Sequence, residues 1–230
     1  MNTATSLSRR FLTVSLWLLL MAALPASALA GNRDVLWTIL NTCLDPTVAD
    51  YCSSCRAPLD VAPCAASRGC RDTTQVWVET QEFVALRDRK MCDCTEEFVH
   101  GLVLPRTKVT GVEDPKRPEG IWKFAWAIAQ SRIPEDAERA LAVNPTGKRD
   151  QDQLHVHVVR LQKDARRRFA KAPNCQVADL HEVWGTACRL AQAAGYADYG
   201  VLVVSDTKGG YLVVVDRAST EKTYTLPRCR

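Results

Sequence analysis

The chain has 230 residues, of which 47% are hydrophobic and 24% are charged, and it contains ten cysteines and six tryptophans. This composition is typical of one globular domain or two small ones, and it excludes disordered, collagen-like and coiled-coil proteins. The 30 basic and 26 acidic residues give a net charge of +4; without the two arginines of the acid-free first thirty residues, the balance is 28 minus 26, or +2. These nearly equal numbers of basic and acidic residues do not suit a protein that binds nucleic acid, and no nucleic-acid partner is expected.

Residues 1–30 have the layout of a secretory signal peptide. Arg9 and Arg10 precede an apolar stretch over 11–24, and an Ala-Leu-Ala sequence ends at Ala30. This order of basic, apolar and small residues predicts cleavage after Ala30. The apolar stretch also approaches the roughly 20 residues that span a bilayer, so an uncleaved N-terminal anchor is the alternative. We expect residues 31–230 to form one exported, periplasmic domain, attached to the inner membrane if the segment stays uncleaved.

All ten cysteines lie beyond residue 30, and export would place them in an oxidising compartment, where cysteines pair. They are Cys43, Cys52, Cys55, Cys64, Cys70, Cys92, Cys94, Cys175, Cys188 and Cys229. Seven of them fall between Cys43 and Cys94, which predicts a disulfide-stapled, loop-rich N-terminal region of undetermined connectivity. Cys52-x-x-Cys55 fits a structural disulfide better than a zinc site or a redox dithiol, because prolines and small residues surround it.

Hydrophobic periodicity predicts the elements of the rest of the chain. In chain order they are a helix over 34–42, an irregular loop over 44–75, strands over 76–87 and 98–104, a loop over 105–118, a helix over 120–132, strands over 139–144 and 154–161 joined by a turn, helices over 162–171 and 177–194, and a hairpin of strands 201–204 and 211–215. Trp122 and Trp126 share one apolar helix face, where core packing is expected. The pattern predicts an α+β fold with a mostly antiparallel sheet flanked by helices.

The stretch NPTGKRDQDQLHVHVV, which begins at Asn144, carries the residues best suited to chemistry. Because strand side chains alternate between faces, Gln153, His155 and His157 are expected on one face, opposite an apolar face of leucine and valine. The core would then fix the strand and hold the two imidazoles rigidly, as a catalytic site requires.

The turn before this strand adds polar groups to the same point. Asn144 and Gln151 can bring amide donors, and Lys148 is either a phosphate contact or an ordinary turn charge. A neutral imidazole with a pKa near 6.5 is a usable nucleophile that can attack phosphorus, and a second one can stabilise the charge that develops. No metal or cofactor is required for this chemistry.

Two other interpretations of the histidines stay open at this point. They can be structural, or they can form a zinc pair, since two imidazoles on one strand face suit that ion. A zinc site needs a third ligand, for which His181, Asp152 and His100 are candidates.

The run LAVNPTGKRDQDQLHVHVV resembles the histidine-triad (HIT) superfamily, with Gln153 at the first triad place and His155 and His157 at the second and third. The closer similarity is to the CDP-diacylglycerol pyrophosphatase family. It extends to the segments FVHGLVLPRTKVTGVEDP, IWKFAWAIAQ and YGVLVVSDTKGGYLVVVDR and to the late Cys229.

The resemblance implies a HIT-like fold and hydrolysis of CDP-diacylglycerol to CMP and phosphatidate. By this likeness His155 is the nucleophile, His157 contacts the phosphate, and Asn144 lies near the phosphates or the ribose. Gln153 would bind phosphate without titrating, and His181 resembles a histidine in the family's C-terminal half.

The expected partners are CDP-diacylglycerol and a membrane surface, which the basic segment 163–171 would contact; no protein partner is predicted. The alternatives are a HIT-like hydrolase of a soluble nucleotide and a disulfide-rich binding protein without enzymatic activity.

Overall fold

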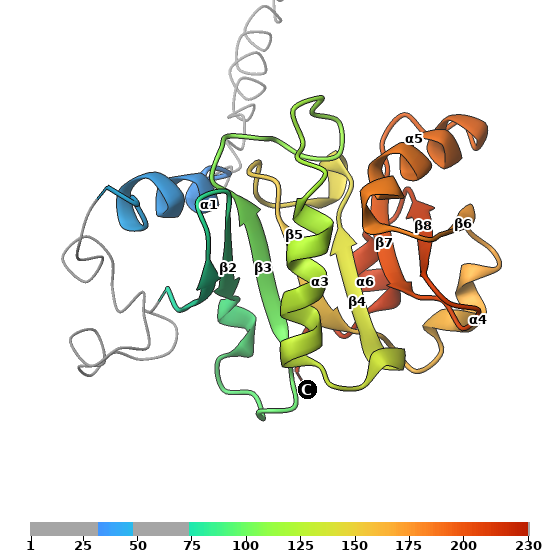
Figure 1. Cartoon of the computed structure of the whole chain (residues 1–230), viewed down its shortest axis with the longest axis horizontal. Coiled ribbons are helices and arrows are strands. Elements are labelled where there is room, and N and C mark those ends of the chain that lie inside the picture. Colours follow the sequence, from blue (N-terminus) through green and yellow to red (C-terminus); the bar gives the residue numbers. More distant parts are fainter. Residues whose placement is uncertain (1–31, 48–73, 230) are drawn as a thin grey trace, which may run out of the picture. The chain divides into compact units, whose positions relative to one another are not determined.

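An eight-stranded antiparallel sheet forms the centre of the computed structural model, which describes residues 32–47 and 74–229 (Figure 1). The strand order is β1-β2-β3-β5-β4-β7-β8-β6. The strands are β1 (Val76–Glu79), β2 (Phe83–Arg87), β3 (His100–Pro105), β4 (Arg139–Val143), β5 (Val156–Arg160), β6 (Asn174–Val177), β7 (Gly200–Ser205) and β8 (Tyr211–Asp216). The predicted α+β class with an antiparallel sheet is therefore confirmed.

Five α-helices and several single helical turns flank the sheet in the described part of the chain. The helices are α1 (Val35–Thr38), α3 (Ile121–Arg132), α4 (Ala165–Phe169), α5 (Val183–Ala193) and α6 (Thr220–Tyr224). The turns are η1 (Ile39–Cys43), η3 (Arg89–Met91), η4 (Asp136–Glu138), η5 (Thr146–Lys148) and η6 (Leu180–Glu182). No helix among these residues is long and apolar enough to cross a bilayer.

Strand β5 holds the central position of the sheet, because it pairs with β3 on one side and with β4 on the other. In this register His157 lies opposite Leu102 of β3 and Ala142 of β4. The β7–β8 hairpin turns through Gly209 and Gly210, whose φ angles of 98° and 70° suit glycine.

One face of the sheet is covered by α3 and α5 and holds the largest apolar cluster. Val156 and Val158 of β5 pack there with Trp122 and Trp126 of α3 and Trp184 of α5. The rings of Trp122 and Trp184 lie 4.7 Å apart. This confirms the expected core role of the tryptophan pair and the apolar face of β5. Figure 1 views the sheet from this side, with α3 in front.

The other face carries two separate apolar clusters. One lies under α1 and η1 and includes Leu102 and Leu104 of β3. The second lies under α4 and α6 and includes Ala142 and Val159. Since His157 pairs with a member of each cluster, its side chain stands in the polar strip between them.

Several elements differ from the prediction. The stretch 76–87 forms two strands, because Thr80 to Glu82 make a tight turn. Strand β6 and helix α6 were not predicted: three of the four β6 residues are exposed, so an alternating pattern is lacking, and α6 has only five residues. The loop from Cys52 to Cys70 lies outside the described residues.

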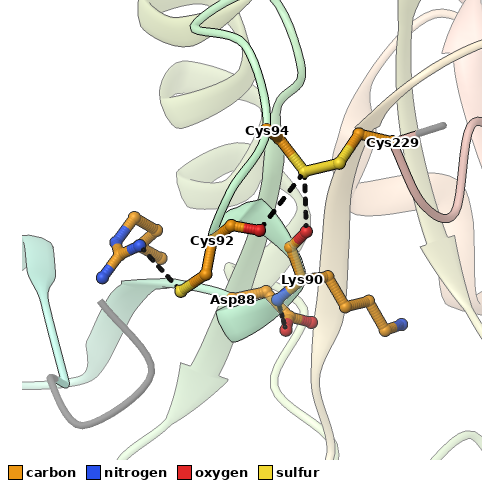
Figure 2. The surroundings of a disulfide bond; sticks show 6 residues. Asp88, Lys90, Cys92, Cys94 and Cys229 are labelled. Atoms are coloured by element: carbon orange, nitrogen blue, oxygen red, sulfur yellow. Dashed lines mark hydrogen bonds between the residues drawn. A yellow bond between two sulfur atoms is a disulfide. The ribbon is translucent and has the colours of Figure 1, made fainter. Parts of the chain in front are cut away.

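The disulfide between Cys94 and Cys229 joins residues 135 positions apart in the sequence. It links the connection between β2 and β3 to the C-terminal segment, beside Asp88 and Lys90 (Figure 2). Cys43 and Cys92 are also disulfide-bonded. Cys175 and Cys188 are free thiols, which corrects the expectation that every cysteine pairs.

Replacing Cys94 and Cys229 together by serine is expected to lower the free energy of unfolding by about 2–5 kcal/mol, because a long loop of the unfolded chain is no longer closed. Urea unfolding followed by fluorescence measures this change. Cys175→Ser is the matched control, since that thiol is exposed and free. Equal unfolding midpoints for the double variant and the control would contradict the expectation.

Candidate active site

His155 stands immediately before β5, and its ring is oriented by the backbone. Its Nδ1 donates to the carbonyl of Gln153 at 2.7 Å. This bond places the ring proton on Nδ1 and leaves the lone pair of Nε2 available. The side chain is nearly buried, and burial lowers the pKa of His155, although the Gln153 carbonyl partly opposes this. His155 is therefore a neutral imidazole at neutral pH.

His157 is the neighbouring imidazole, and its ring centroid lies 4.8 Å from that of His155. Its Nδ1 lies 3.0 Å from Nε2 of His100, and its Nε2 lies 3.4 Å from Nδ2 of Asn144. Burial lowers the pKa of His157 well below its ordinary value of 6.5, with the Glu221 carboxylate opposing the change. Both histidines of the motif thus share one environment.

Asn144, just after β4, defines which nitrogen of His157 carries the proton. The Oδ1 of Asn144 accepts from the hydroxyl of Ser219 at 2.8 Å and from the backbone N–H of Glu221 at 3.2 Å. These two donors fix the amide so that its NH₂ group faces His157. The Nε2 of His157 consequently accepts, and its Nδ1 donates to His100.

His100, the first residue of β3, is completely buried. It is diagonal to His157 in the sheet, because it pairs with Val159. Burial lowers the pKa of His100 to about 4, and the nearby Asp88 carboxylate only partly offsets this. The Oδ2 atom of Asp88 lies 3.5 Å from Nε2 of His100.

Glu221 of α6 brings a buried carboxylate to the same cluster. Its Oε1 forms an ion pair with Nζ of Lys90 at 2.6 Å, and its Oε2 accepts from Asn144 at 2.9 Å. The carboxylate lies 3.5 Å from Nε2 of His157 and 3.6 Å from Nε2 of His100. Burial alone would raise the pKa of Glu221, but the charge and hydrogen bond of Lys90 lower it, so the group is an anion.

A pocket of about 280 Å³ opens onto this cluster. Five of its ten lining residues are lysine or arginine and two are acidic; the lining consists of Lys90, Asn144, Lys148, Arg149, Asp150, His157, Glu221, Lys222, Pro227 and Arg228. Two of the cations are already engaged, since Lys90 pairs with Glu221 and Arg149 binds Glu113 at 2.6 Å. Lys148 and Lys222 are exposed. The pocket reaches His157, whereas His155 is not among its lining residues.

Two of the predicted substrate-binding residues are used elsewhere. The amide of Gln153 donates to the carbonyls of Pro105 and Thr107, both at 2.9 Å, and thereby holds the loop after β3. Gln151 bonds the N-terminal segment, where it accepts from the backbone of Leu36 at 3.1 Å. Gln153 contributes to the site through its backbone carbonyl, which orients His155.

His181 does not reach the cluster. It is an exposed residue of η6, which leads into α5 on the face of the sheet opposite to His157. The sheet separates the two, so this placement argues against the predicted substrate contact of His181. Asp152 is also unsuited as a zinc ligand, because it pairs with Arg33 at 2.7 Å.

The described residues contain one group with the spacing of a metal site: Asp88, His100 and His157, whose candidate ligand atoms lie within 4.8 Å of one another. The His155–His157 zinc pair considered from the sequence is not this group. In the structure, the two ligand nitrogens of His100 and His157 already share a hydrogen bond at 3.0 Å.

Sequence reasoning missed Lys90 and Glu221 and considered His100 only as a metal ligand. Glu221 is 77 residues from its partner Asn144, and nothing local distinguishes it from a surface glutamate. For His100 a signal was present: antiparallel pairing of the predicted strands 98–104 and 154–161 brings it close to His157.

A nearly buried imidazole with a free ring nitrogen, next to a pocket with five cationic side chains, is typical of enzymes that act on phosphorylated substrates. A model of the family described as CDP-diacylglycerol pyrophosphatase matches residues 31–196. The chain belongs to that family, so it is a phosphoanhydride hydrolase, and CDP-diacylglycerol is the substrate that the family implies. The comparison with curated proteins gave no match.

The fold is expected to lose stability as the pH falls from 6.5 towards 4. The pKa of His100 is lower in the folded than in the unfolded state, so the unfolded chain binds more protons in this interval. His100 alone contributes about 3 kcal/mol to this loss. Urea unfolding at pH 7.5 and 4.5 should show a smaller difference for His100→Gln than for the wild type, whereas the control His181→Gln should keep the wild-type difference. Equal differences in the free energy of unfolding for the two variants would refute the expected contribution of His100.

Proposed function

We propose that the protein hydrolyses the pyrophosphate bond of CDP-diacylglycerol through a nucleotidyl intermediate on His155, within a HIT-like fold. The observation that supports this most directly is the hydrogen bond from Nδ1 of His155 to the Gln153 carbonyl, because it leaves Nε2 as a neutral nucleophile. The neighbouring His157 and Asn144 supply polar groups where the phosphates would bind.

In the first proposed step, Nε2 of His155 attacks the cytidylyl phosphorus and phosphatidate leaves. The leaving group is a phosphate monoester, whose anion is stable without a proton, so the step needs charge stabilisation more than an acid. The basic lining of the pocket, including Lys148 and Lys222, suits that role. In the second step, water cleaves the bond between His155 and CMP.

We further propose that residues 1–30 direct export to the periplasm, either as a cleaved signal or as an inner-membrane anchor, and that residues 31–230 form the catalytic domain. This places the enzyme where its lipid substrate is accessible. The basic segment around α4 is a candidate for lipid contact, but only in part. Arg166 and Arg168 are engaged within the protein, the first with the carbonyl of Ser205 and the second with Asp164. Exposed cations of this segment are Lys163, Arg167 and Lys171.

His155→Ala is expected to lower the release of CMP from CDP-diacylglycerol by about 10³-fold or more, since it removes the nucleophile. The assay follows both products with EDTA present, and full wild-type activity in EDTA is expected. A substrate labelled in the cytidylyl phosphate should leave acid-labile label on the wild type and none on the variant. His181→Ala is the control and should keep wild-type turnover.

Retention of full activity by His155→Ala would refute the proposed nucleophile. Faster turnover of CDP-choline or a dinucleotide than of CDP-diacylglycerol would point to a soluble nucleotide as the substrate instead.

Charge reversal of the exposed basic segment, by Lys163→Glu, Arg167→Glu and Lys171→Glu together, is expected to weaken binding to vesicles that contain anionic lipid at least several-fold. Binding of the full chain to neutral vesicles should not change and serves as the control. Sedimentation with vesicles of each composition measures the binding of the protein. Unaltered binding to anionic vesicles would exclude this segment as the lipid contact.

A further inference from the structure

Three buried titratable groups from separate segments meet beside the pocket: His100 of β3, His157 of β5 and Glu221 of α6. Their solvent-exposed fractions are 0%, 3% and 3%, respectively. Burying such groups is costly unless they are hydrogen-bonded or paired. Only His157 belongs to the motif, and Glu221 lies beyond the residues that match the family model. The role of the other two groups is unassigned.

The hydrogen bonds of this cluster give His157 a definite chemical state. Its Nδ1–H is donated to His100, and its unprotonated Nε2 accepts from Nδ2 of Asn144 across a long distance of 3.4 Å, at the wall of the pocket that both residues line. A neutral imidazole in this tautomer accepts a proton at Nε2. It is therefore arranged as a base.

The charges around His157 permit that proton to be accepted. A proton on Nε2 would lie next to the Glu221 carboxylate, which is 3.5 Å away. Burial opposes the charged form of His157, and so do His155, His100 and Lys90. A carboxylate oxygen of Asp88 lies within 4.8 Å of a ring nitrogen of His157. Glu221, at 3.5 Å, is the carboxylate that acts most strongly in favour of an imidazolium here, and Lys90 and the Asn144 amide hold it in place.

The two proposed steps of the reaction differ in their need for a base. His155 attacks as a neutral imidazole and the leaving phosphate monoester is stable as an anion, so no proton has to be removed in the first step. In the second step, a water molecule attacks phosphorus and must lose a proton. The ring of His157 is adjacent to that of His155, with 4.8 Å between centroids.

We infer that His100 and Glu221 are positioning residues that make His157 the base for the second, hydrolytic step. This inference rests on the proposed function. The water oxygen bonds to phosphorus as the bond from phosphorus to Nε2 of His155 breaks. The water proton passes to Nε2 of His157, and the electron pair of the broken bond returns to His155, which leaves as a neutral imidazole. CMP departs as a monoanion, and His157 then releases its proton to solvent.

Rapid-quench kinetics of Glu221→Gln on CDP-diacylglycerol test this assignment. The expected result is a burst of phosphatidate at the wild-type rate, followed by CMP release slowed about 10- to 100-fold. Labelled nucleotidyl protein should accumulate as a consequence. Glu96→Gln, an exposed glutamate before β3, is the matched control and should follow wild-type kinetics.

Two substitutions of His100 give an independent readout. Glutamine keeps an acceptor for Nδ1–H of His157, whereas leucine removes it, so His100→Gln should retain more of the second step than His100→Leu. The pH at which CMP release falls to half its plateau should move downwards in Glu221→Gln, because the anion that stabilises the imidazolium is gone.

Two outcomes separate the inference from the proposed function. If the variants slow the burst and the CMP release equally, or if the half-plateau pH stays unchanged, His100 and Glu221 have only a structural role and the inference is wrong. If the wild type itself forms no labelled intermediate, the proposed nucleotidyl-histidine mechanism fails first.

Discussion

The register of β5 between β3 and β4 is the constraint on which the candidate site depends. Strand side chains alternate between the two faces of the sheet. A shift of the pairing register by one residue would therefore point the side chain of His157 into the tryptophan-rich core and bring Val156 and Val158 into the polar strip. The apolar packing on one face therefore fixes the positions of the imidazoles on the other. Pairing on both sides of β5 leaves it no freedom to slip, so the core stabilises the geometry of the site as well as the fold.

The electrostatic character of the site follows from the same position. The two apolar clusters on this face flank the strip, and burial keeps His100, His155 and His157 neutral. The buried anion beside these neutral rings is Glu221, whose charge is paired with Lys90. A neutral imidazole next to a pocket with several cations would suit the proposed attack on an anionic phosphoanhydride, because the ring needs no deprotonation and the cations would attract the phosphates.

Much of the fold could be predicted from the sequence, because periodicity reports local structure. The central strands, α3 and the glycine hairpin have clear periods, and the alternation around His155 and His157 predicted their common environment. Strand β6 was not predicted because it is exposed, and α6 was not predicted because it is short. The partners of His157 could not be predicted for another reason. His100 and Glu221 are 57 and 64 residues away from it in the sequence, and no local pattern encodes contacts over such separations. Gln153 shows the opposite error, since a residue in a motif position uses its side chain to hold a loop.

The C-terminal segment has a consequence for the order of events during synthesis. It supplies Glu221, Lys222 and Arg228 to the pocket and ends beside the bond between Cys94 and Cys229. During synthesis, the strand that carries the motif histidines leaves the ribosome well before the C-terminal residues that complete the lining of the pocket. The site therefore becomes complete only after residues 221–228 have been synthesised and have folded back onto the sheet, so a chain truncated before Glu221 would carry both motif histidines and still have an incomplete site.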